Sequence, residues 1–344
     1  MISHMEPQIN EFSKNGNDCR ILIEQVQNKT QVHAYLLSGE KGVGKRTLAR
    51  LVGASLLCTS DGQRPCGICK NCKMSRSGEH PDVIVIEKGA PIASNVRKDR
   101  STIPVDDIRE MIRLCSVRSP EGNLHIVLIF DADKMTAQAQ NCLLKTLEEP
   151  PEKTFLMLVT EHPESLLPTI ISRCRNVRFR PWNDEYINNV LSKSGFPDKK
   201  IKEIIPEAWG SIGRALDLSS DESYWKLREE ILKVFFQTFQ RSEILKISNE
   251  WKDKKNDAEK ILQILESYVR MMLYTRLKQK DHEYLHDFPI QWQTFAQRSE
   301  IERFIYLLNA IAESRKQLQY SVNFQAVFEQ LLFIFMGEGS KWQK

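Results

Sequence analysis

Hydrophobic residues in the first half of the chain come in short runs. These runs are residues 32–37, 82–86, 125–130 and 155–160. A strand that is buried on both faces has no polar side, so runs of this kind are typical of a parallel sheet whose strands are separated by helices. One such helix is predicted to begin at Pro104, with Asp106 and Asp107 near its N-terminus. We therefore expect an α/β fold in this part of the chain.

Beyond about residue 180 the apolar residues recur at helical spacing instead. Pro181 marks the boundary, because a residue that precedes a proline is disfavoured in helical conformation. We predict an α/β base domain at 1–180, a small helical lid at 181–220 and an all-helical domain at 221–344. The segment Trp251–Lys255 is expected to be only a solvated connection. The apolar stripes of the last domain are Leu227/Ile231/Val234/Phe235, Ile261/Ile264/Leu265/Tyr268/Val269/Met272, Ile301/Phe304/Ile305/Leu308 and Phe324/Val327/Phe328/Leu331/Leu332/Phe335.

Composition narrows the class of protein without naming a function. The chain has 344 residues, of which 41% are hydrophobic and 27% charged, as in an ordinary soluble protein of two or three domains. A net charge of +4 over this length does not predict nucleic-acid binding. No apolar run is long enough to span a membrane, and Met1–Asn17 lacks a hydrophobic signal core, so we expect a cytoplasmic protein. The arginines that could still form a basic patch, or simply a solvated face, are Arg173, Arg175, Arg178 and Arg180.

A glycine-rich segment, Ser38–Thr47, follows the first predicted strand and leads into a predicted helix. It carries the pattern Gly-x-x-x-x-Gly-Lys of a phosphate loop, in which backbone N–H groups surround phosphates and the lysine reaches their oxygens. The next residue is usually a Ser or Thr that binds Mg²⁺, but here it is Arg46, which has only donors and a permanent positive charge. Thr47 is turned about 100° further round the helix and is no simple substitute. The predicted nucleotide-contacting residues of the loop are Gly39, Gly42, Gly44, Lys45, Arg46 and Thr47. A tight turn whose glycines serve only packing is the alternative.

The predicted strand at 125–130 ends in Asp131-Ala132-Asp133. An acidic residue at this place, downstream of a phosphate loop, is where nucleotide-binding folds hold the carboxylate that orients Mg²⁺. Many hydrolysing proteins have a glutamate at the next position, which polarises the attacking water, whereas this chain has Ala132. Asp133 lies one residue too far along to be assumed equivalent. A simple helix N-cap is the alternative role for Asp131.

Four of the eight cysteines lie close together in the sequence, at Cys58, Cys66, Cys69 and Cys72. In a reducing compartment, four thiolates on a short polar segment can close tetrahedrally on Zn²⁺. Because four thiolates leave no position for water or substrate, the site is expected to be structural. Unconnected cysteines or a chance disulfide are the alternatives. We expect His80 to be a loop residue rather than a ligand.

Two further motifs point to a family. Residues 143–151 read Leu-Leu-Lys-Thr-Leu-Glu-Glu-Pro-Pro, and Ser172-Arg173-Cys174 follows the next predicted strand. Together with the cysteine cluster placed after the phosphate-loop helix, these motifs resemble the clamp-loader branch of the AAA+ ATPases over roughly the first two thirds of the chain. The resemblance implies a subunit of a hetero-pentamer, with motor (gamma/tau) and delta subunits, that sets a sliding clamp on primed DNA.

The resemblance also implies roles for single residues. Arg173 matches an arginine that acts in trans on the neighbouring subunit's nucleotide, and Thr160 matches a residue that senses the γ-phosphate. Gly213 stands where motor subunits carry a second phosphate-sensing arginine, and the adjacent Arg214 is not counted as its replacement.

The departures from the family pattern indicate which kind of subunit the chain is. Positions 46, 132 and 213 lack the catalytic groups of a motor subunit, whereas the trans arginine Arg173 is retained. This combination implies a stator that does not hydrolyse ATP, although nucleotide binding stays open. The last domain would be the collar of the ring, with part of its last helix facing a neighbour. An active motor subunit is the alternative, and a free-standing zinc-dependent nucleic-acid-binding module is a weaker one.

Overall fold

The computed structural model describes residues 8–90, 101–117, 119, 124–236, 243–277, 288, 290–320 and 322–340, without the side chains of 291, 319 and 336–340. The chain forms two compact units. The first comprises Met1–Ile201 with Ala208–Leu216, and the second comprises Lys202–Glu207 with Asp217–Lys344. The expected division into three domains stays a prediction, and residues 1–7 of the expected polar start lie outside the described residues.

A five-stranded parallel sheet forms the centre of the first unit, which confirms the predicted α/β fold. Its spatial order is β2-β3-β4-β1-β5. The strands are β1 (Ala34–Ser38), β2 (Val83–Ile86), β3 (His125–Ile129), β4 (Thr154–Thr160) and β5 (Arg175–Arg178). All residues of β3 and β4 are buried, as expected of strands covered on both faces.

The edge strand β5 was not predicted. Only Val177 of its four residues is buried, so the strand carries no apolar run that a pattern search could detect. Its backbone pairs with β1, and its arginines are exposed. The exposure of Arg175 and Arg178 fits both sequence interpretations, a basic patch and a solvated face.

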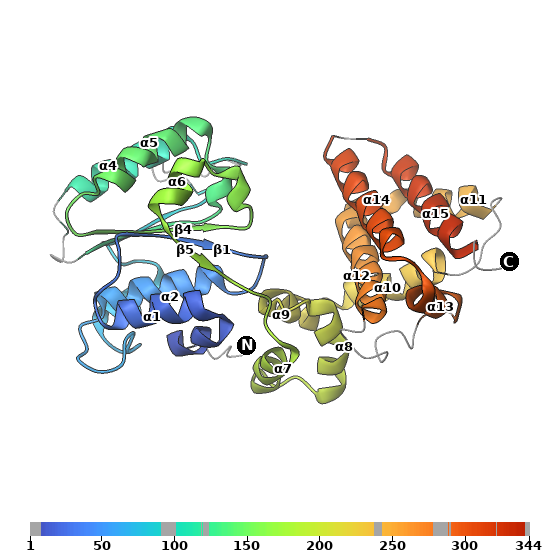
Figure 1. The fold of residues 1–344 in the computed structure, drawn as a ribbon, viewed down its shortest axis with the longest axis horizontal. Helices are drawn as coiled ribbons and strands as arrows, with labels where there is room; N and C mark the ends of the chain where they lie inside the picture. Colours follow the sequence, from blue (N-terminus) through green and yellow to red (C-terminus); the bar gives the residue numbers. More distant parts are fainter. Residues whose placement is uncertain are drawn as a thin grey trace. The chain divides into compact units, whose positions relative to one another are not determined.

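Helices cover both faces of the sheet (Figure 1). On one side lie α1 (Asn17–Gln27) and α2 (Lys45–Leu57), and on the other lie α4 (Val105–Ser116), α5 (Ala137–Glu148) and α6 (Pro168–Arg173). The helix predicted at Pro104 is confirmed as α4, with Pro104 as its N-cap residue. The smaller elements of this unit are η1 (Ile9–Asn15), α3 (Lys70–Ser77), η2 (Ala132–Lys134), η3 (Pro163–Ser165) and α7 (Asp184–Lys193). Two more helices, α8 (Asp198–Ala208) and α9 (Ile212–Ser220), contribute residues to both units.

The second unit is all-helical in its described part. Its helices are α10 (Glu222–Phe235), α11 (Ile244–Trp251), η5 (Lys252–Asp257), α12 (Ala258–Arg276), α13 (Ile290–Arg298), α14 (Ile301–Gln319) and α15 (Phe324–Ser340). Edge-to-face aromatic pairs fill its core, such as Phe236 with Trp292 at a centroid distance of 4.8 Å. The stripes predicted on α12 and α15 are buried. No helix in the described ranges combines the length and apolar character needed to cross a bilayer.

Two details of this unit correct the sequence expectations. On α14 the buried face is Phe304, Leu307 and Ile311, whereas Ile301 and Ile305 are 40% and 47% exposed. The predicted stripe was right for Phe304 but wrong for Ile301 and Ile305. Ile305, next to Phe304, lies about 100° round the helix and away from the core.

The segment Trp251–Lys255 is not merely a solvated connection. Trp251 is buried and stacks on Phe328 at a centroid distance of 5.0 Å, and the residues after it begin the 3₁₀ helix η5. The lysines around the tryptophan masked its apolar contact in the sequence.

Candidate functional site

The phosphate loop, residues 38–47, begins at the end of β1, which lies between β4 and β5 in the sheet, and it ends in the first turn of α2. Gly42 and Gly44 have φ angles of 75° and 103°, which disfavour any residue with a Cβ. An added Cβ would lie 2.3 Å from Ser211 Oγ at Gly42 and 2.7 Å from the Phe12 ring at Gly44. The glycines therefore serve both the backbone conformation and close packing around the loop.

Hydrogen bonds from outside the loop fix its carbonyl groups. Ser211 Oγ donates to Lys41 O at 2.9 Å, and the N–H of Gly213 donates to Gly42 O at 2.9 Å. The indole Nε1 of Trp182 donates to Val43 O at 2.8 Å. These bonds join the loop to the start of α9 and to the segment that follows β5.

Lys45 is folded back onto the loop. Its Nζ donates to the carbonyls of Gly39 and Glu40 at 2.8 and 2.6 Å, and the residue is only 5% exposed. Burial holds the pKa of Lys45 below its usual range, with Arg46 adding to the effect. A phosphate would offer this ammonium a charged partner in place of two carbonyls.

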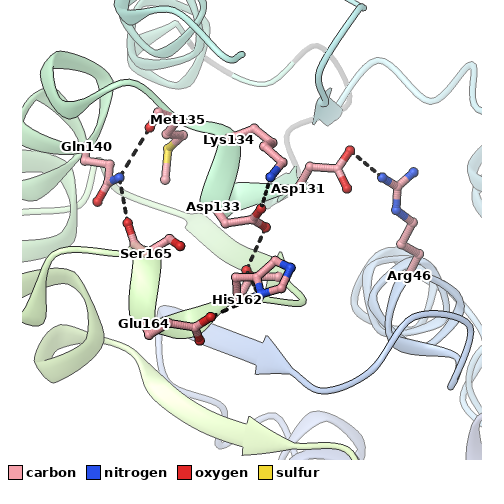
Figure 2. Close-up of polar contacts among 10 residues, drawn as sticks. Arg46, Asp131, Asp133, Lys134, Met135, Gln140, His162, Glu164 and Ser165 are labelled. Carbon is pink, nitrogen blue, oxygen red and sulfur yellow. Dashed lines mark hydrogen bonds and ion pairs between the residues drawn. The ribbon is translucent and has the colours of Figure 1, made fainter. Parts of the chain in front are cut away.

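Arg46 reaches across from α2 to the end of β3, as Figure 2 shows. Its Nη2 lies 2.7 Å from Asp131 Oδ2, and its Nη1 lies 3.0 Å from Glu87 Oε2. The guanidinium also lies over the ring of Phe130, 4.8 Å from the centroid. Asp131 occupies the N-cap position of η2, yet its side chain makes no capping bond, so its described partner is Arg46.

Asp133 and Thr160 form a second polar contact beside the loop. Thr160 Oγ1 donates to Asp133 Oδ1 at 2.8 Å, and Lys134 Nζ lies 3.0 Å from Asp133 Oδ2. Burial would raise the pKa of Asp133, but these donors hold it below its usual range. Thr160 pairs in register with Ser38, so the sheet itself brings Thr160 to the start of the loop. Ala132 is fully buried and belongs to the hydrophobic core of the first unit.

A cavity of about 940 Å³ lies over the phosphate loop. The predicted residues Gly42, Gly44, Lys45, Arg46, Thr47, Asp131 and Thr160 line it. Sequence reasoning missed other lining residues, which include Glu11, Phe12, Tyr186, Val190, Ile212 and Leu216. These residues come from η1, α7 and α9, and carry no motif of their own. The Tyr186 hydroxyl donates to Glu11 at 2.8 Å, and burial followed by the Glu11 carboxylate raises the pKa of Tyr186.

Gly213 explains why α9 can lie against the loop. A Cβ at this position would lie 3.0 Å from Gly42 Cα and 3.3 Å from Gly42 O. A larger side chain at 213 would therefore push the helix from the loop in this arrangement. The cavity-lining residues of α9 are Ile212, Gly213 and Leu216, so Arg214 lies off the cavity.

Arg173 lies away from the phosphate loop, at the last residue of α6. Its Nη1 donates to Thr169 O at 3.0 Å, and its Nη2 lies 2.5 Å from Glu148 Oε1 at the end of α5. The side chain of Arg173 is 34% exposed. The ion pair thus holds the arginine at the surface of the first unit.

The four clustered cysteines come together between α2 and α3. Their Sγ atoms all lie within 4.8 Å of one another, with 3.9 Å between Cys66 and Cys72 and 4.0 Å between Cys58 and Cys69. Four sulfurs at about 2.3 Å from a tetrahedral Zn²⁺ lie about 3.8 Å apart, so these four residues could hold a metal ion. His80 is buried outside this cluster, and its Nδ1 accepts from the N–H of Asp82 at 3.1 Å.

The thiols of the cluster differ in acidity, because hydrogen bonds lower the pKa of Cys66 and Cys69 whereas burial raises the pKa of Cys72 to about 12. Burial raises the pKa of Cys69, but N–H donors from Cys72 and Thr59 outweigh it and lower the pKa to about 6. The N–H groups of Cys69 and Cys72 donate to the sulfurs of Cys66 and Cys69 at 3.4 Å. Thiolates stabilised in this way are the form of cysteine that binds metal.

Sequence comparisons place this chain among replication proteins. A family model described as DNA polymerase III, delta subunit, matches residues 14–183, and a model of the C-terminal part of that subunit matches residues 222–336. The DNA polymerase III subunit delta' of Bacillus subtilis is 28% identical over 320 residues, which cover 92% of this chain and 94% of that protein. The delta' subunit of Escherichia coli is 32% identical over 219 residues, covering 63% of each chain.

Other subunits of the same polymerase match a shorter part. The Escherichia coli tau subunit is 35% identical over 160 residues, covering 46% of this chain and 23% of that protein. Among solved structures, a gamma subunit-related protein from Thermotoga maritima has a TM-score of 0.44 and 18% identity, covering 92% of this chain and 99% of that one. The family models and the relatives named delta' show that this chain belongs to the family of DNA polymerase III delta and delta' subunits.

Proposed function

We propose that this protein is the delta' subunit of a bacterial clamp loader and works as its stator. In this role it helps to set the sliding clamp on primed DNA, in a hetero-pentamer with motor (gamma/tau) and delta subunits. Full-length similarity to a delta' subunit supports the assignment, whereas the tau match is confined to less than half of the chain. Such a complex works on the chromosome, in the bacterial cytoplasm.

The contact between Arg46 and Asp131 carries the proposal that this subunit does not hydrolyse ATP. At 2.7 Å the guanidinium holds the carboxylate that would orient Mg²⁺, and no metal-binding hydroxyl stands at position 46. Ala132 supplies no group to polarise water, and Gly213 supplies no phosphate-sensing charge. An active motor of the gamma/tau type would need those groups.

Arg173 is proposed to act on the nucleotide of the neighbouring subunit. It lies at the surface of the first unit, outside the residues that line the cavity of this chain. Glu148 holds it there, and an exposed ion pair of this kind is worth only about 0–1 kcal/mol, so a phosphate group could displace it. A trans arginine can then stabilise charge that develops on the transferred phosphoryl group.

The cysteine cluster is proposed to bind a structural Zn²⁺. Cys58, Cys66, Cys69 and Cys72 would supply all four ligands, which leaves no position for catalysis. Metal binding would hold together the polar segment 58–69, which ends at the N-cap of α3.

The three-domain division remains part of the proposal. In it, residues 1–180 form the nucleotide-binding base, 181–220 the lid and 221–344 the collar that assembles the ring. Exposed Ile301 and Ile305 on α14 give the collar an apolar surface for a neighbouring subunit.

The test is ATP turnover with and without partner subunits. The purified chain should show no Mg²⁺-dependent ATPase activity, and it should assemble with candidate motor and delta subunits into a complex that loads clamps. Appreciable ATPase activity of the chain alone, abolished by Lys45→Ala, would instead favour a motor subunit. Failure to assemble would remove the basis of the stator role.

The trans role of Arg173 has its own test. Arg173→Ala should leave assembly intact and slow DNA-stimulated ATP turnover by the complex, where related arginines contribute about 10³ to 10⁵ in rate per site. Arg20→Ala, which removes an arginine from the surface of α1, is the matched control. Unchanged turnover with Arg173→Ala would refute the role.

A further inference from the structure

The cavity over the phosphate loop is lined by groups of two kinds. Gly42, Gly44 and Lys45 belong to the loop, and apolar groups of Phe12, Val190, Ile212 and Leu216 lie beside it. The charged lining is mixed, with the cations Lys41, Lys45, Arg46, Lys88, Lys134 and Lys193 and the carboxylates Glu11, Asp131, Asp133 and Glu161. Its volume of about 940 Å³ is within the range of small-molecule sites. Apolar side chains beside a phosphate loop suit a nucleoside polyphosphate, with the base on the apolar side chains and the phosphates on the loop.

The place beside Asp131 that Mg²⁺ would take is occupied by the side chain of Arg46. Mg²⁺ would need near-octahedral oxygen ligands at about 2.0–2.1 Å. Asp131 Oδ2 instead lies 2.7 Å from Arg46 Nη2, so a metal on this carboxylate would stand next to a fixed positive charge. Coulomb repulsion between the two cations, at a partly buried site, opposes metal binding.

Arg46 is held in place as a cation rather than left mobile. Asp131 and Glu87 each take one terminal nitrogen, and the ring of Phe130 lies beneath the guanidinium. A guanidinium has five N–H donors, so two carboxylate contacts leave donors for a phosphate oxygen. Its side chain is 45% exposed and lines the cavity.

Hydrogen bonds from outside the loop hold its backbone in place. Bonds from Trp182, Ser211 and Gly213 fix its carbonyls, so little ordering would be required on binding. Lys45 needs only to exchange two carbonyl acceptors for phosphate oxygens.

We propose that this cavity binds a nucleoside di- or triphosphate without Mg²⁺, and that Arg46, fixed on Asp131 and Glu87, takes the place of the metal ion. The inference rests on the proposed nucleotide site of the stator, and it specifies that the nucleotide binds there without Mg²⁺. The stator would thus hold a nucleotide as a fixed structural ligand.

Equilibrium dialysis of the purified chain with radiolabelled ADP, in excess EDTA or excess Mg²⁺, tests this directly. The expected result is binding in EDTA that is at least as tight as in Mg²⁺. A tenfold or greater loss of affinity in EDTA would overturn the proposal, and so would absence of ADP binding in both buffers. This primary comparison needs no variant and does not depend on folding of a mutant.

A pair of variants then identifies the cation. Arg46→Thr restores a hydroxyl and removes the charge, so affinity in EDTA should fall by about tenfold or more, as expected for loss of a charge-assisted bond, and Mg²⁺ should partly restore it. Arg50→Thr is the matched control, because its guanidinium also lies over the Phe130 ring, at 5.3 Å. It should leave both affinities unchanged. Equal affinities for Arg46→Thr and the wild type in EDTA would also overturn the proposal.

Failure of this inference can be told apart from failure of the proposed function. Dialysis uses the isolated chain, whereas the stator role is tested by assembly with partner subunits and by Arg173→Ala. Metal-dependent binding, or none, would leave assembly and the trans arginine untouched. Failure to assemble would leave the dialysis result standing.

Discussion

Arg46 and Lys45 are adjacent in the sequence but have different surroundings. Lys45 is buried against loop carbonyls, and burial lowers its pKa, whereas Arg46 is half-exposed and paired with two carboxylates. A guanidinium can bridge carboxylates with several donors at once, which an ammonium on a flexible stem does less well. Two adjacent residues of the motif thus have different partners, loop carbonyls for Lys45 and carboxylates for Arg46.

At the scale of single residues, the cysteine cluster predicts that zinc retention depends on each of the four thiols. Cys69→Ser removes one of four sulfurs, so zinc retention should weaken, because structural sites of this kind need all four ligands. Zinc per chain, measured by mass spectrometry after dialysis against a chelator, checks this. Cys142→Ser, at a partly buried cysteine of α5 outside the cluster, is the control. Equal zinc content in Cys69→Ser and wild type would refute the four-thiolate site.

At the scale of secondary-structure elements, the packing of α9 on the phosphate loop depends on Gly213, which has no side chain. Gly213→Ala would place a Cβ 3.0 Å from Gly42 Cα, where only backbone could yield. We expect a net loss of stability of about 1 kcal/mol, measured by urea denaturation, because the usual cost of overpacking is partly offset by the higher helix propensity of Ala. Gly62→Ala is the control, because its Cβ would meet only Ser60 Oγ at 3.8 Å. An unchanged urea midpoint for Gly213→Ala would show that the loop can move aside.

Another prediction at this scale concerns the start of α10. Asp221 caps the helix by accepting from the N–H of Tyr224 at 3.0 Å, and it binds Lys260 of α12 at 2.8 Å. Lys260, followed by Ser223, lowers the pKa of Asp221 to about 2. An aspartate in the unfolded chain has a pKa of about 3.9. Because the folded pKa is the lower one, the stabilisation is complete above about pH 4 and is lost as the pH falls through about 2.

Asp221→Ala should therefore cost about 1 kcal/mol at neutral pH, as expected for a lost cap, and less as the pH is lowered toward 3. Urea denaturation at several pH values checks the trend. Asp221→Asn keeps a capping oxygen but no charge, so it should lose mainly the pH-dependent part. A cost for Asp221→Ala that grows on acidification would contradict the sign of this argument.

At the scale of the whole molecule, the exposed isoleucines of α14 are the surface residues to test for contact with other subunits. Ile301 and Ile305 are four residues apart on α14 and are exposed, although the rest of the helix contributes Phe304, Leu307 and Ile311 to the core. Residues four apart lie on one face of a helix, so the two isoleucines form one apolar strip.

Ile305→Asp should therefore weaken assembly of the complex and leave the fold of the isolated chain unchanged. Gel filtration of the reconstituted complex and circular dichroism of the chain measure the two effects. Leu245→Asp, on exposed Leu245 of α11, is the matched control for a new charge on the second unit. Normal assembly with Ile305→Asp would exclude this strip from the interface.

The sequence alone determined the parallel sheet, the phosphate loop, the cysteine cluster and the family, because apolar runs and close motifs are local properties of a chain. It could not show β5, whose arginines carry no apolar signal, or the buried face of α14, which adjacent isoleucines and phenylalanine left ambiguous. Only the tertiary structure brought Arg46 to Asp131, across 85 residues, and Gly213 to Gly42. Contacts of this kind depend on how the strands are ordered and how the helices pack on them, and no residue's neighbours in the sequence specify that.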